Sequence, residues 1–374
     1  MHLPRAALED WMRDFYFDTS LDLGSSGVRC YSLAELRALL GITVEELDAI
    51  ALDDSPSYGG ALLRRAVADR FTGGDTDRVM ATHGSTEAIF VVMNALLSAG
   101  DEVVVVDPAY HSLTSVAEAI GCRLVRWRLR PETGFTPDMA ELRALVTPRT
   151  RMIVVNFPHN PTGAHLTRAQ FDDLLDLVDG HPELRLVWDA AFAELVWDGE
   201  PLPDPSVLHD RCVSLGTMSK AYGLPGTRVG WCLAAPDVLE RLVALRDALT
   251  ICLSPLTEHL AARALAGADR ILADRRTRAA RNLERLTAWA DDHNDLVSWS
   301  RPAGGVTAFP AFTGITDTED LCRDLGARYD LLLVPGSGFG HPDRVRLGFG
   351  GAEDTFAAGL DRLHKALTER QGAL

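Results

Sequence analysis

A lysine, small hydroxyl residues and an arginine share one loop-like stretch, residues 217–231. Lys220 follows Ser219 on a segment too rich in glycine and proline for a helix, and Arg228 stands just before an apolar strand. A lysine amine attacks a carbonyl only when it is held, partly desolvated and close to groups that lower its pKa. The stretch therefore predicts a Schiff-base lysine with an anion clamp. A lone Ser-Lys pair more often marks a surface lysine in a turn, so the wider pattern has to decide.

A second candidate for anion binding lies nearer the N-terminus. Gly84, Ser85 and Thr86 follow a short apolar segment, 79–82, and open a helical pattern that runs over 87–97. The first N–H groups of a helix and its positive dipole end favour a phosphate at such a position. Serine and threonine also cap helices for structural reasons, so this segment alone fits either role.

Apolar segments alternate with helical patterns through the first two thirds of the chain. The predicted strands are 79–82, 102–107, 123–129, 152–156, 184–189, 212–216 and 229–234. The apolar run 103–106 is continuous, as expected for a strand covered by helices on both faces. This alternation predicts an α/β fold with a mainly parallel sheet, whose ligands gather beyond the carboxyl ends of the strands. Asn160, Asp189 and Lys220 all follow predicted strands, so we expect them at that edge.

Composition excludes several classes of function. Lys+Arg of 37 against Asp+Glu of 53 gives a net charge of -16, which disfavours nucleic acid and anionic membrane surfaces as partners. The six cysteines are scattered without a C-x-x-C pair, which predicts free thiols and neither a metal site nor a disulfide framework. The start has no signal-like apolar region and no apolar run is long enough to cross a bilayer, so we expect a cytoplasmic protein.

The length of 374 residues favours more than one domain. We expect an N-terminal arm over 1–45 that contributes to the small domain and the substrate pocket, a large cofactor-binding domain over 46–255, and a small α+β domain over 256–374. In the last part the alternation loosens into a helix over 270–291, short strands near 305–309, 331–334 and 344–349, and a terminal helix.

Taken in chain order, these residues resemble the fold type I pyridoxal-phosphate enzymes of the aspartate aminotransferase family. The resemblance covers nearly the whole chain and rests on Tyr58, Gly84-Ser85-Thr86, Tyr110, Asn160-Pro161-Thr162-Gly163, Asp189, Ser219-Lys220, Arg228 and Arg346. It implies a mainly parallel central sheet with helices on both faces, a smaller α+β C-terminal domain and pyridoxal 5'-phosphate as cofactor. It also implies a homodimer with shared active sites.

The resemblance gives each of these residues a role. Lys220 would bind the cofactor covalently and move the Cα proton of the substrate. Asp189 would pair with the protonated pyridine nitrogen and keep the ring an electron sink, although alone it fits a helix cap as well. Tyr110 would stack on the ring, and Asn160 would donate a hydrogen bond to the phenolic oxygen of the cofactor.

The same resemblance implies which residues would bind the cofactor phosphate and the substrate carboxylate. Phosphate ligands would come from the backbone of Gly84, Ser85 and Thr86, the side chains of Thr217, Ser219 and Arg228, and Tyr58 of the neighbouring subunit. Arg346 would grip the substrate α-carboxylate, whereas we expect Arg344 to be a solvated surface charge. Phe192 departs from the family, which commonly has a tyrosine there. Because phenylalanine cannot donate a hydrogen bond to the cofactor oxygen, we expect the cofactor to be tuned differently.

The N-terminal arm carries a narrower resemblance. Leu8-Glu9-Asp10-Trp11, residues 22–28 and residues 31–37 resemble the capreomycidine synthase group of this family. That likeness implies cyclisation of 3-hydroxy-L-arginine to a cyclic guanidino amino acid for antibiotic biosynthesis. The steps would be Cα deprotonation, loss of the β-hydroxyl and addition of the guanidine to Cβ. Asp22, Gly24, Ser25 and Ser26 become candidate substrate contacts, although composition alone predicts a plain turn there.

Other functions use the same residues. An ordinary aminotransferase would pass the amino group to a 2-oxo acid, and a β-lyase would split a thioether amino acid. A cofactor-binding relative without catalysis is a further alternative. The residues that bind the guanidinium, and the stereochemistry at C3, are left open by the sequence.

Overall fold

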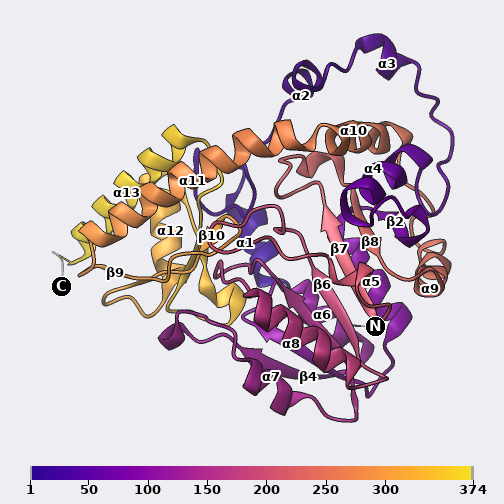
Figure 1. Cartoon of the computed structure of the whole chain (residues 1–374). Coiled ribbons are helices and arrows are strands. Elements are labelled where there is room, and N and C mark those ends of the chain that lie inside the picture. The colour runs from indigo at the N-terminus through magenta and orange to yellow at the C-terminus, as the bar shows by residue number, and fades with distance from the viewer. Residues whose placement is uncertain (1, 372–374) are drawn as a thin grey trace.

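A twisted seven-stranded sheet forms the centre of the computed structural model, which describes residues 2–371 (Figure 1). Its strand order is β2-β8-β7-β6-β5-β3-β4. The strands are β2 (Val79–Thr82), β3 (Glu102–Asp107), β4 (Arg123–Arg128), β5 (Thr150–Asn156), β6 (Arg185–Asp189), β7 (Cys212–Thr217) and β8 (Gly230–Leu233). Neighbours from β7 to β4 run parallel, whereas β8 runs antiparallel to both β2 and β7. The predicted mainly parallel sheet is confirmed.

The continuous apolar run of β3 is explained by burial on both faces of the sheet. Val103 and Val105 pack into the core beneath α5 (Gly84–Leu96), α6 (Ser112–Ile120) and α9 (Pro236–Arg246). Val104 and Val106 belong to the second core on the opposite face. Because successive strand side chains point to opposite faces, both sets must be apolar when helices cover both sides.

The opposite face of the sheet and its flank are covered by a second set of helices. These are α4 (Ala61–Phe71), α7 (Met139–Leu145), α8 (Arg168–Asp179) and α10 (Pro255–Ala266). Helix α8 begins at a capping box in which Thr167 and Gln170 satisfy each other's backbone N–H groups. The short α2 (Leu33–Leu40) and α3 (Val44–Asp48) lie along the outer edge, over α10 and α4 (Figure 1).

The C-terminal part packs three helices against short strands. The helices are α11 (Ala268–Asp292), α12 (Thr318–Tyr329) and α13 (Glu353–Gln371), and the strands are β9 (Val297–Ser298), β10 (Thr307–Ala308), β11 (Ala311–Phe312), β12 (Leu331–Leu332), β13 (Val334–Pro335) and β14 (Val345–Gly348). The single strand expected over 331–334 is wrong, because the chain splits there into β12 and β13. Strand β12 pairs with the N-terminal arm and β13 pairs with β14, so the two strands belong to different sheets.

The N-terminal arm is built into this C-terminal part. After α1 (Ala7–Phe15), the two-residue β1 (Leu21–Asp22) pairs in parallel with β12. Leu23 is only 1% exposed, and its carbonyl accepts a hydrogen bond from the N–H of Gly348 at 2.8 Å. The plain turn expected for this segment is therefore preceded by a strand, whose partner lies some three hundred residues later in the chain.

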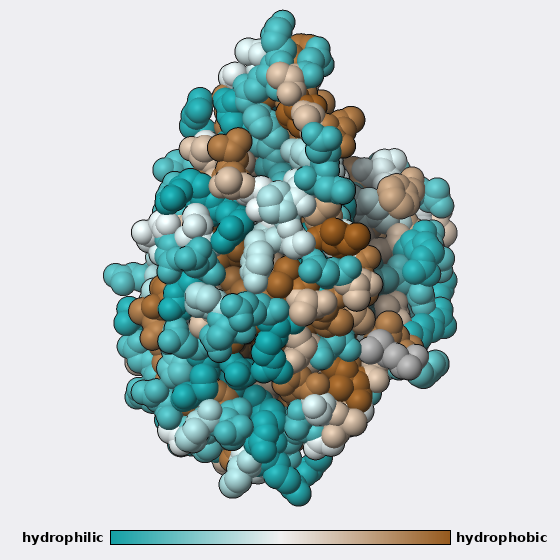
Figure 2. All heavy atoms as spheres, turned by 90° about the vertical axis from the view of Figure 1, so that its right-hand side faces the viewer, coloured by the Kyte–Doolittle hydropathy of each residue, from teal (hydrophilic) through white to brown (hydrophobic). Residues whose placement is uncertain are grey.

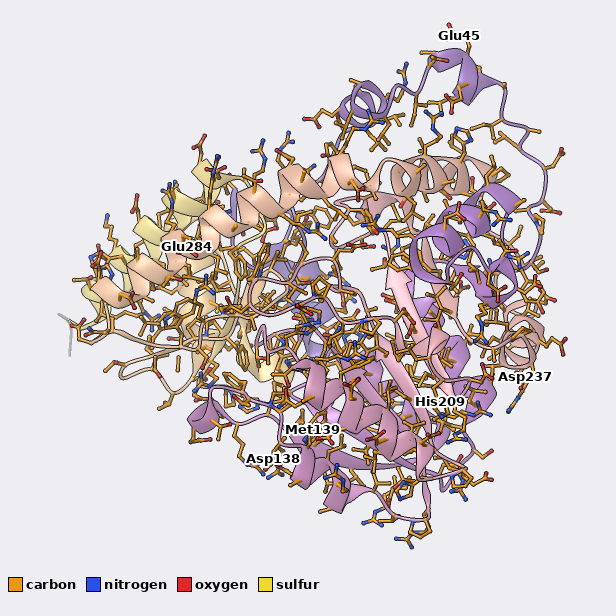
Figure 3. All side chains as sticks on the ribbon, viewed as in Figure 1. Glu45, Asp138, Met139, His209, Asp237 and Glu284 are labelled. Carbon is orange, nitrogen blue, oxygen red and sulfur yellow. The ribbon has the colours of Figure 1, made fainter. Side chains whose placement is uncertain are left out.

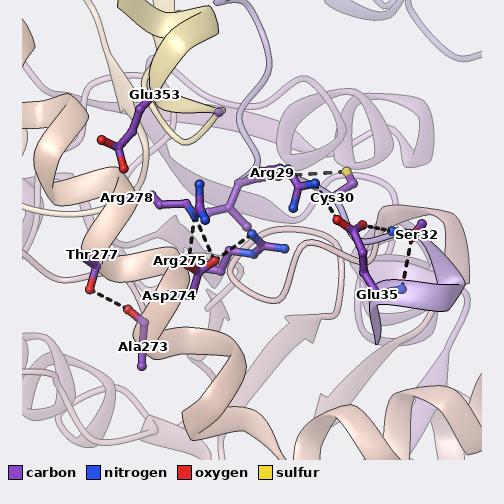
Figure 4. A network of polar contacts seen from close by, with 12 residues as sticks. Arg29, Cys30, Ser32, Glu35, Ala273, Asp274, Arg275, Thr277, Arg278 and Glu353 are labelled. Carbon is purple, nitrogen blue, oxygen red and sulfur yellow. Dashed lines mark hydrogen bonds and ion pairs between the residues drawn. The ribbon is translucent and has the colours of Figure 1, made fainter. Parts of the chain in front are cut away.

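A polar network holds the arm where it leaves the C-terminal part (Figure 4). Arg29 pairs with Glu35 at 2.6 Å, and Glu35 also completes the capping box of α2 with Ser32. On the other side, the guanidinium of the buried Arg275 lies 3.7 Å from the ring centroid of Tyr31. The arm is thus tied both to α2 and to the long helix α11.

The surface carries much of the acidic excess. Glu45, Asp237 and Glu284 are exposed and point outward at the periphery (Figure 3). The six cysteines are all free, as expected. Within residues 2–371, none of the helices is both apolar and long enough to cross a bilayer, and no cluster of His, Cys, Asp and Glu could hold a metal ion.

The packing of the arm can be tested through Leu23. We expect Leu23→Ala to lower the free energy of unfolding by about 2–5 kcal/mol, because it leaves a cavity beneath α13 where the methyl groups lay. Urea denaturation measures this change. Leu33→Ala, at a side chain that is 52% exposed, is the matched control and should alter stability little. Equal effects of the two variants would contradict the anchoring of the arm.

Candidate active site

One cavity of about 900 Å³ lies at the carboxyl ends of β5, β6 and β7, beneath the N-terminal arm. It is lined by fourteen of the residues that the sequence analysis gave a role: Asp22, Ser25, Ser26, Ser85, Thr86, Tyr110, Asn160, Asp189, Phe192, Thr217, Ser219, Lys220, Arg228 and Arg346. Gly24 and Gly84 adjoin it through contacts with its two arginines. Parallel strands bring these positions together because their carboxyl ends meet at one edge.

Lys220 reaches into this cavity from the loop that follows β7. Its Nζ donates a hydrogen bond to the hydroxyl of Ser26 at 2.8 Å. Desolvation, reinforced by the guanidinium of Arg346, lowers the pKa of the Lys220 amine to about 8, although the carboxylate of Asp189 opposes this shift. About a tenth of the amine is therefore neutral and nucleophilic at pH 7, far more than for an unshifted lysine.

Asp189 ends β6 and is 5% exposed. Its Oδ1 accepts a hydrogen bond from the N–H of Ala191 at 3.0 Å, and burial raises the pKa of the carboxyl to about 6. No arginine or lysine of the described residues forms a close ion pair with it. A buried carboxylate with this environment is stabilised by a cation such as a protonated ring nitrogen.

The N-terminus of α5 and the loop after β7 form a cradle for an anion. Gly84 has a φ of 75°, and a Cβ there would lie 2.9 Å from Nη2 of Arg228. Arg228 itself adopts a φ of 53°, a conformation that is uncommon for residues other than glycine. The hydroxyls of Thr217 and Ser219 are 3.0 Å apart beside it. Free helical N–H groups, hydroxyls and a guanidinium together suit a phosphate.

The strand ends are locked together beside the expected ring site. The side chain of Asn156 donates to the carbonyl of Asp189 and accepts from the N–H of Asn160, both at 2.9 Å. The Tyr110 hydroxyl donates to Glu9 at 3.0 Å, and burial raises the pKa of this phenol to about 12. The ring of Phe192 has its centroid 5.9 Å from Nζ of Lys220. It offers an apolar wall where a tyrosine would offer a donor.

Arg346 is 3% exposed and opens toward the same cavity. Its Nε and Nη2 donate to the carbonyl of Gly24, at 3.1 Å and 2.8 Å, and Nη1 lies 3.5 Å from Oδ1 of Asn160. Burial lowers the pKa of this guanidinium to about 10. Its close partners in the chain are neutral oxygens, so the buried charge favours an anion such as a substrate carboxylate.

The expectation for Arg344 is wrong. This arginine is only 8% exposed, donates from Nη1 to the carbonyl of Phe309 at 3.0 Å and lies 5.2 Å from the ring centroid of Phe135. Arg344 directly precedes β14, the central strand of a three-stranded sheet, in which all four residues are buried. Side chains two residues apart in an extended segment point to the same face, so Arg344 lies on the same side as the buried Arg346.

One face of α1 supplies pocket residues that sequence reasoning missed. Glu9, Met12, Arg13 and Tyr16 all line the cavity. Their spacing of three and four residues marks a single helix face, and Trp11 is buried on the other face. That periodicity could have identified them, but it does not say which of the two faces meets a ligand.

Tyr58 does not line the cavity of its own chain. Its ring lies 5.6 Å from the guanidinium carbon of Arg64, next to the start of α4. A smaller cavity of about 460 Å³ lies between α4 and α10. Its cations Arg70 and Arg263 already pair with Glu194 and Glu46, so it lacks the uncommitted charges of the main cavity.

Pyridoxal 5'-phosphate fits the main cavity by the chemistry of its lining. The cradle at Gly84 and Arg228 suits the phosphate, the unpaired carboxylate of Asp189 suits the ring nitrogen, and Lys220 suits the aldehyde. Tyr110 and Asn160, the residues expected to stack on the ring and to bind its phenolic oxygen, line the same cavity.

Comparison with known proteins agrees with this chemistry. The family model for aminotransferase class I and II matches residues 53–363. Capreomycidine synthase from Streptomyces vinaceus is 48% identical over 369 residues, which cover 98% of this chain and 94% of that protein. The crystal structure of the pyridoxal-phosphate-dependent cyclase OrfR is 44% identical with a TM-score of 0.94, covering 99% of this chain and 98% of that one.

A crystal structure of a pyridoxal-phosphate-dependent aminotransferase from Streptococcus suis is 29% identical, with a TM-score of 0.93 and 99% of both chains covered. The likeness in sequence and in structure thus extends over nearly the full length, and the residues that suit the cofactor lie in one cavity. The chain therefore belongs to the aminotransferase class I and II family, which comprises pyridoxal-phosphate-dependent enzymes of fold type I.

Proposed function

We propose that the protein is a pyridoxal-phosphate-dependent cyclase that converts 3-hydroxy-L-arginine into a cyclic guanidino amino acid of the capreomycidine type. The observation that carries this proposal is the charge arrangement of the cavity. Lys220, Arg346, Arg228 and Asp189 suit the cofactor and an α-amino acid, and carboxylates remain beyond them. The likeness to capreomycidine synthase over nearly the whole chain supports the choice of substrate.

The remaining carboxylates belong to Glu9 of α1 and Asp22 of β1, which both line the cavity. One oxygen of Glu9 accepts from Tyr110, and one oxygen of Asp22 accepts from the N–H groups of Gly24 and Ser25. Each carboxylate is thereby oriented, and no lysine or arginine of the described residues forms an ion pair with it. A guanidinium has five donors in a planar fork, so it is well suited to such acceptors.

Different residues of this chain have different roles in the proposed reaction. Bound pyridoxal phosphate would supply the electron sink for charge that develops at Cα. Arg346 holds the α-carboxylate, and the neutral amine of Lys220 takes the Cα proton. The β-hydroxyl then leaves as water with the proton that Lys220 has taken from Cα, and a guanidine nitrogen forms a bond to Cβ. The proton that this nitrogen loses is balanced by a proton returned to Cα, so the net change is the loss of one water.

Ring closure requires the arginine side chain to fold back over the reacting carbons. The carboxylates of Glu9 and Asp22 come from the arm, above the strand ends that carry Lys220 and Asp189. Holding the guanidinium on that side brings its nitrogen toward Cβ, and such orientation lowers the entropic part of the barrier. Walls such as Phe192 and Val28 exclude water from the same space.

We also propose a homodimer in which Tyr58 completes the phosphate site of the partner. Exposed apolar side chains support this, including Leu52 at 81%, Leu62 at 69% and Ile251 at 56% exposure. Figure 2, which views the side where α4 and α9 lie, shows apolar side chains among polar ones. Exposed apolar patches of this kind mark association surfaces.

The three-part division of the chain into 1–45, 46–255 and 256–374 is likewise proposed. The pairing of β1 with β12 supports an arm that belongs with the C-terminal part. The boundary at 255–256 falls at the start of α10, and the long helix α11 that follows leads from the large part into the small one.

The reaction itself gives the first test. We expect the purified holoenzyme, without any 2-oxo acid, to convert 3-hydroxy-L-arginine into a product lighter by one water that retains its amino group and all guanidine nitrogens. Mass spectrometry measures this. Lys220→Ala should abolish product formation, because no other lysine of the described residues lines the cavity. Unchanged substrate, together with keto acid formation once 2-oxoglutarate is supplied, would identify an aminotransferase instead.

Recognition of the guanidinium gives the second test. We expect Glu9→Gln to raise KM for the hydroxylated arginine by about 10- to 100-fold, because a charge-assisted hydrogen bond is replaced by a neutral one. Steady-state kinetics measures the change. Glu45→Gln, at an exposed carboxylate of α3, is the matched control and should leave KM unaltered. A KM for Glu9→Gln equal to that of the control would remove Glu9 from the substrate site.

The lowered pKa of Lys220 gives the third test. Only the neutral amine attacks the cofactor aldehyde, and the folded protein shifts its pKa from 10.5 to about 8. Uptake of pyridoxal phosphate by cofactor-free protein should therefore accelerate about tenfold per pH unit below pH 8 and level off above it. Stopped-flow absorbance follows this reaction. A rate that keeps rising to pH 10 would indicate an unshifted lysine.

A further inference from the structure

A short segment of the arm contacts two cations of the cavity, Lys220 and Arg346. The carbonyl of Gly24 accepts two hydrogen bonds from Arg346, and two residues later the hydroxyl of Ser26 accepts one from Nζ of Lys220 at 2.8 Å. Ser26 is 7% exposed, although it lies in a connecting segment. The contact with Lys220 spans 194 residues of sequence, so the fold itself creates it.

The backbone on both sides of Ser26 is held by close packing. A Cβ on Gly348 would lie 1.9 Å from the carbonyl oxygen of Ser25, and one on Gly350 would lie 2.3 Å from that of Gly27. Glycine is required at both positions because any side chain would displace the arm. The Ser26 hydroxyl therefore occupies a fixed place relative to Lys220.

We propose that Ser26 is a positioning residue that holds the Lys220 amine on the Arg346 side of the site and so directs its proton back to the substrate Cα. This inference rests on the proposed cyclase function and explains how one lysine could favour cyclisation over amino-group transfer. In amino-group transfer, the same lysine must carry the Cα proton onward to the cofactor carbon that had been the aldehyde. An amine tethered beside the α-carboxylate clamp returns it to Cα instead.

Other groups around the amine do not provide this tether. The charged groups near Lys220 are Arg346, Asp189, Glu9 and Arg228. None of them makes a direct hydrogen bond to Nζ in the described chain, and the Phe192 ring lies 5.9 Å away. A lysine has a long, rotatable stem, so one short-range partner decides where its amine rests. The Ser26 oxygen is that partner.

The proposal is tested by the ratio in which the reaction yields cyclic product and aminated cofactor. Holoenzymes of the wild type, Ser26→Ala and Ser26→Thr receive 3-hydroxy-L-arginine without a 2-oxo acid, and chromatography quantifies cyclic product and aminated cofactor. We expect Ser26→Ala to raise the ratio of aminated cofactor to cyclic product by at least about tenfold. The barrier to protonation at the cofactor carbon should fall relative to the barrier to protonation at Cα. Ser26→Thr keeps a hydroxyl and should restore the wild-type ratio.

A matched control addresses the arm. Ser20→Ala removes an arm hydroxyl that bonds to Asp330 outside the cavity, at 2.6 Å, and should leave the ratio unchanged. A role of Ser26 that is only structural would lower both products together. A fall in overall rate with an unchanged ratio in Ser26→Ala would therefore overturn the proposal.

Two further measurements do not depend on cyclisation. The first uses L-arginine, which lacks the β-hydroxyl, in D2O. Ser26→Ala should raise cofactor amination, followed by absorbance, relative to deuterium exchange at Cα, followed by NMR. In cofactor-free protein, Ser26→Ala should move the midpoint of the pH profile for cofactor uptake downward, because the lost acceptor had favoured the ammonium form.

These measurements separate the two proposals. If the wild type forms no cyclic product, the cyclase function is wrong, and the L-arginine ratio and the uptake midpoint still decide the role of Ser26. If both match the wild type in Ser26→Ala, Ser26 does not position Lys220.

Discussion

The site depends on keeping two like charges, those of Lys220 and Arg346, in one desolvated cavity. Burial lowers the pKa of both groups, and the guanidinium of Arg346 lowers the pKa of the Lys220 amine further. Two neutral oxygens of the arm, from Gly24 and Ser26, each hold one of these cations at a defined position. A carboxylate in that place would form an ion pair and occupy the groups that the substrate needs. Neutral acceptors fix the geometry and leave the charge available.

This constraint explains why the arm pairs with and packs against the C-terminal part. A segment that only turned over the cavity could not fix hydroxyl and carbonyl positions within hydrogen-bond distance. Pairing of β1 with β12 and the burial of Leu23 anchor it at one end, and the pair of Arg29 and Glu35 anchors it at the other. The large part carries most of the residues proposed to bind the cofactor, and the arm carries residues proposed to contact the substrate. Specificity can therefore change in the arm without disturbing the sheet.

The acidic groups of the arm complement this arrangement. Glu9 is oriented by Tyr110, the residue expected to stack on the cofactor, so the same contact connects cofactor and substrate recognition. Asp22 is oriented by the turn that also presents Gly24 to Arg346. The carboxylate clamp and the proposed guanidinium site thus share one short piece of backbone. Together they fit an amino acid that is anionic at one end and cationic at the other.

Local patterns in the sequence determined the sheet and the residues at its edge. The apolar runs that became β3 and β5 specify buried strands by composition alone, and Asn160, Asp189 and Lys220 follow strands that must end at one edge. The contact of Ser26 with Lys220, the burial of Arg344 and the break between β12 and β13 were decided by tertiary structure. Each depends on partners far away in the chain, and no spacing or periodicity near Ser26 or Arg344 encodes which distant segment will pack against it.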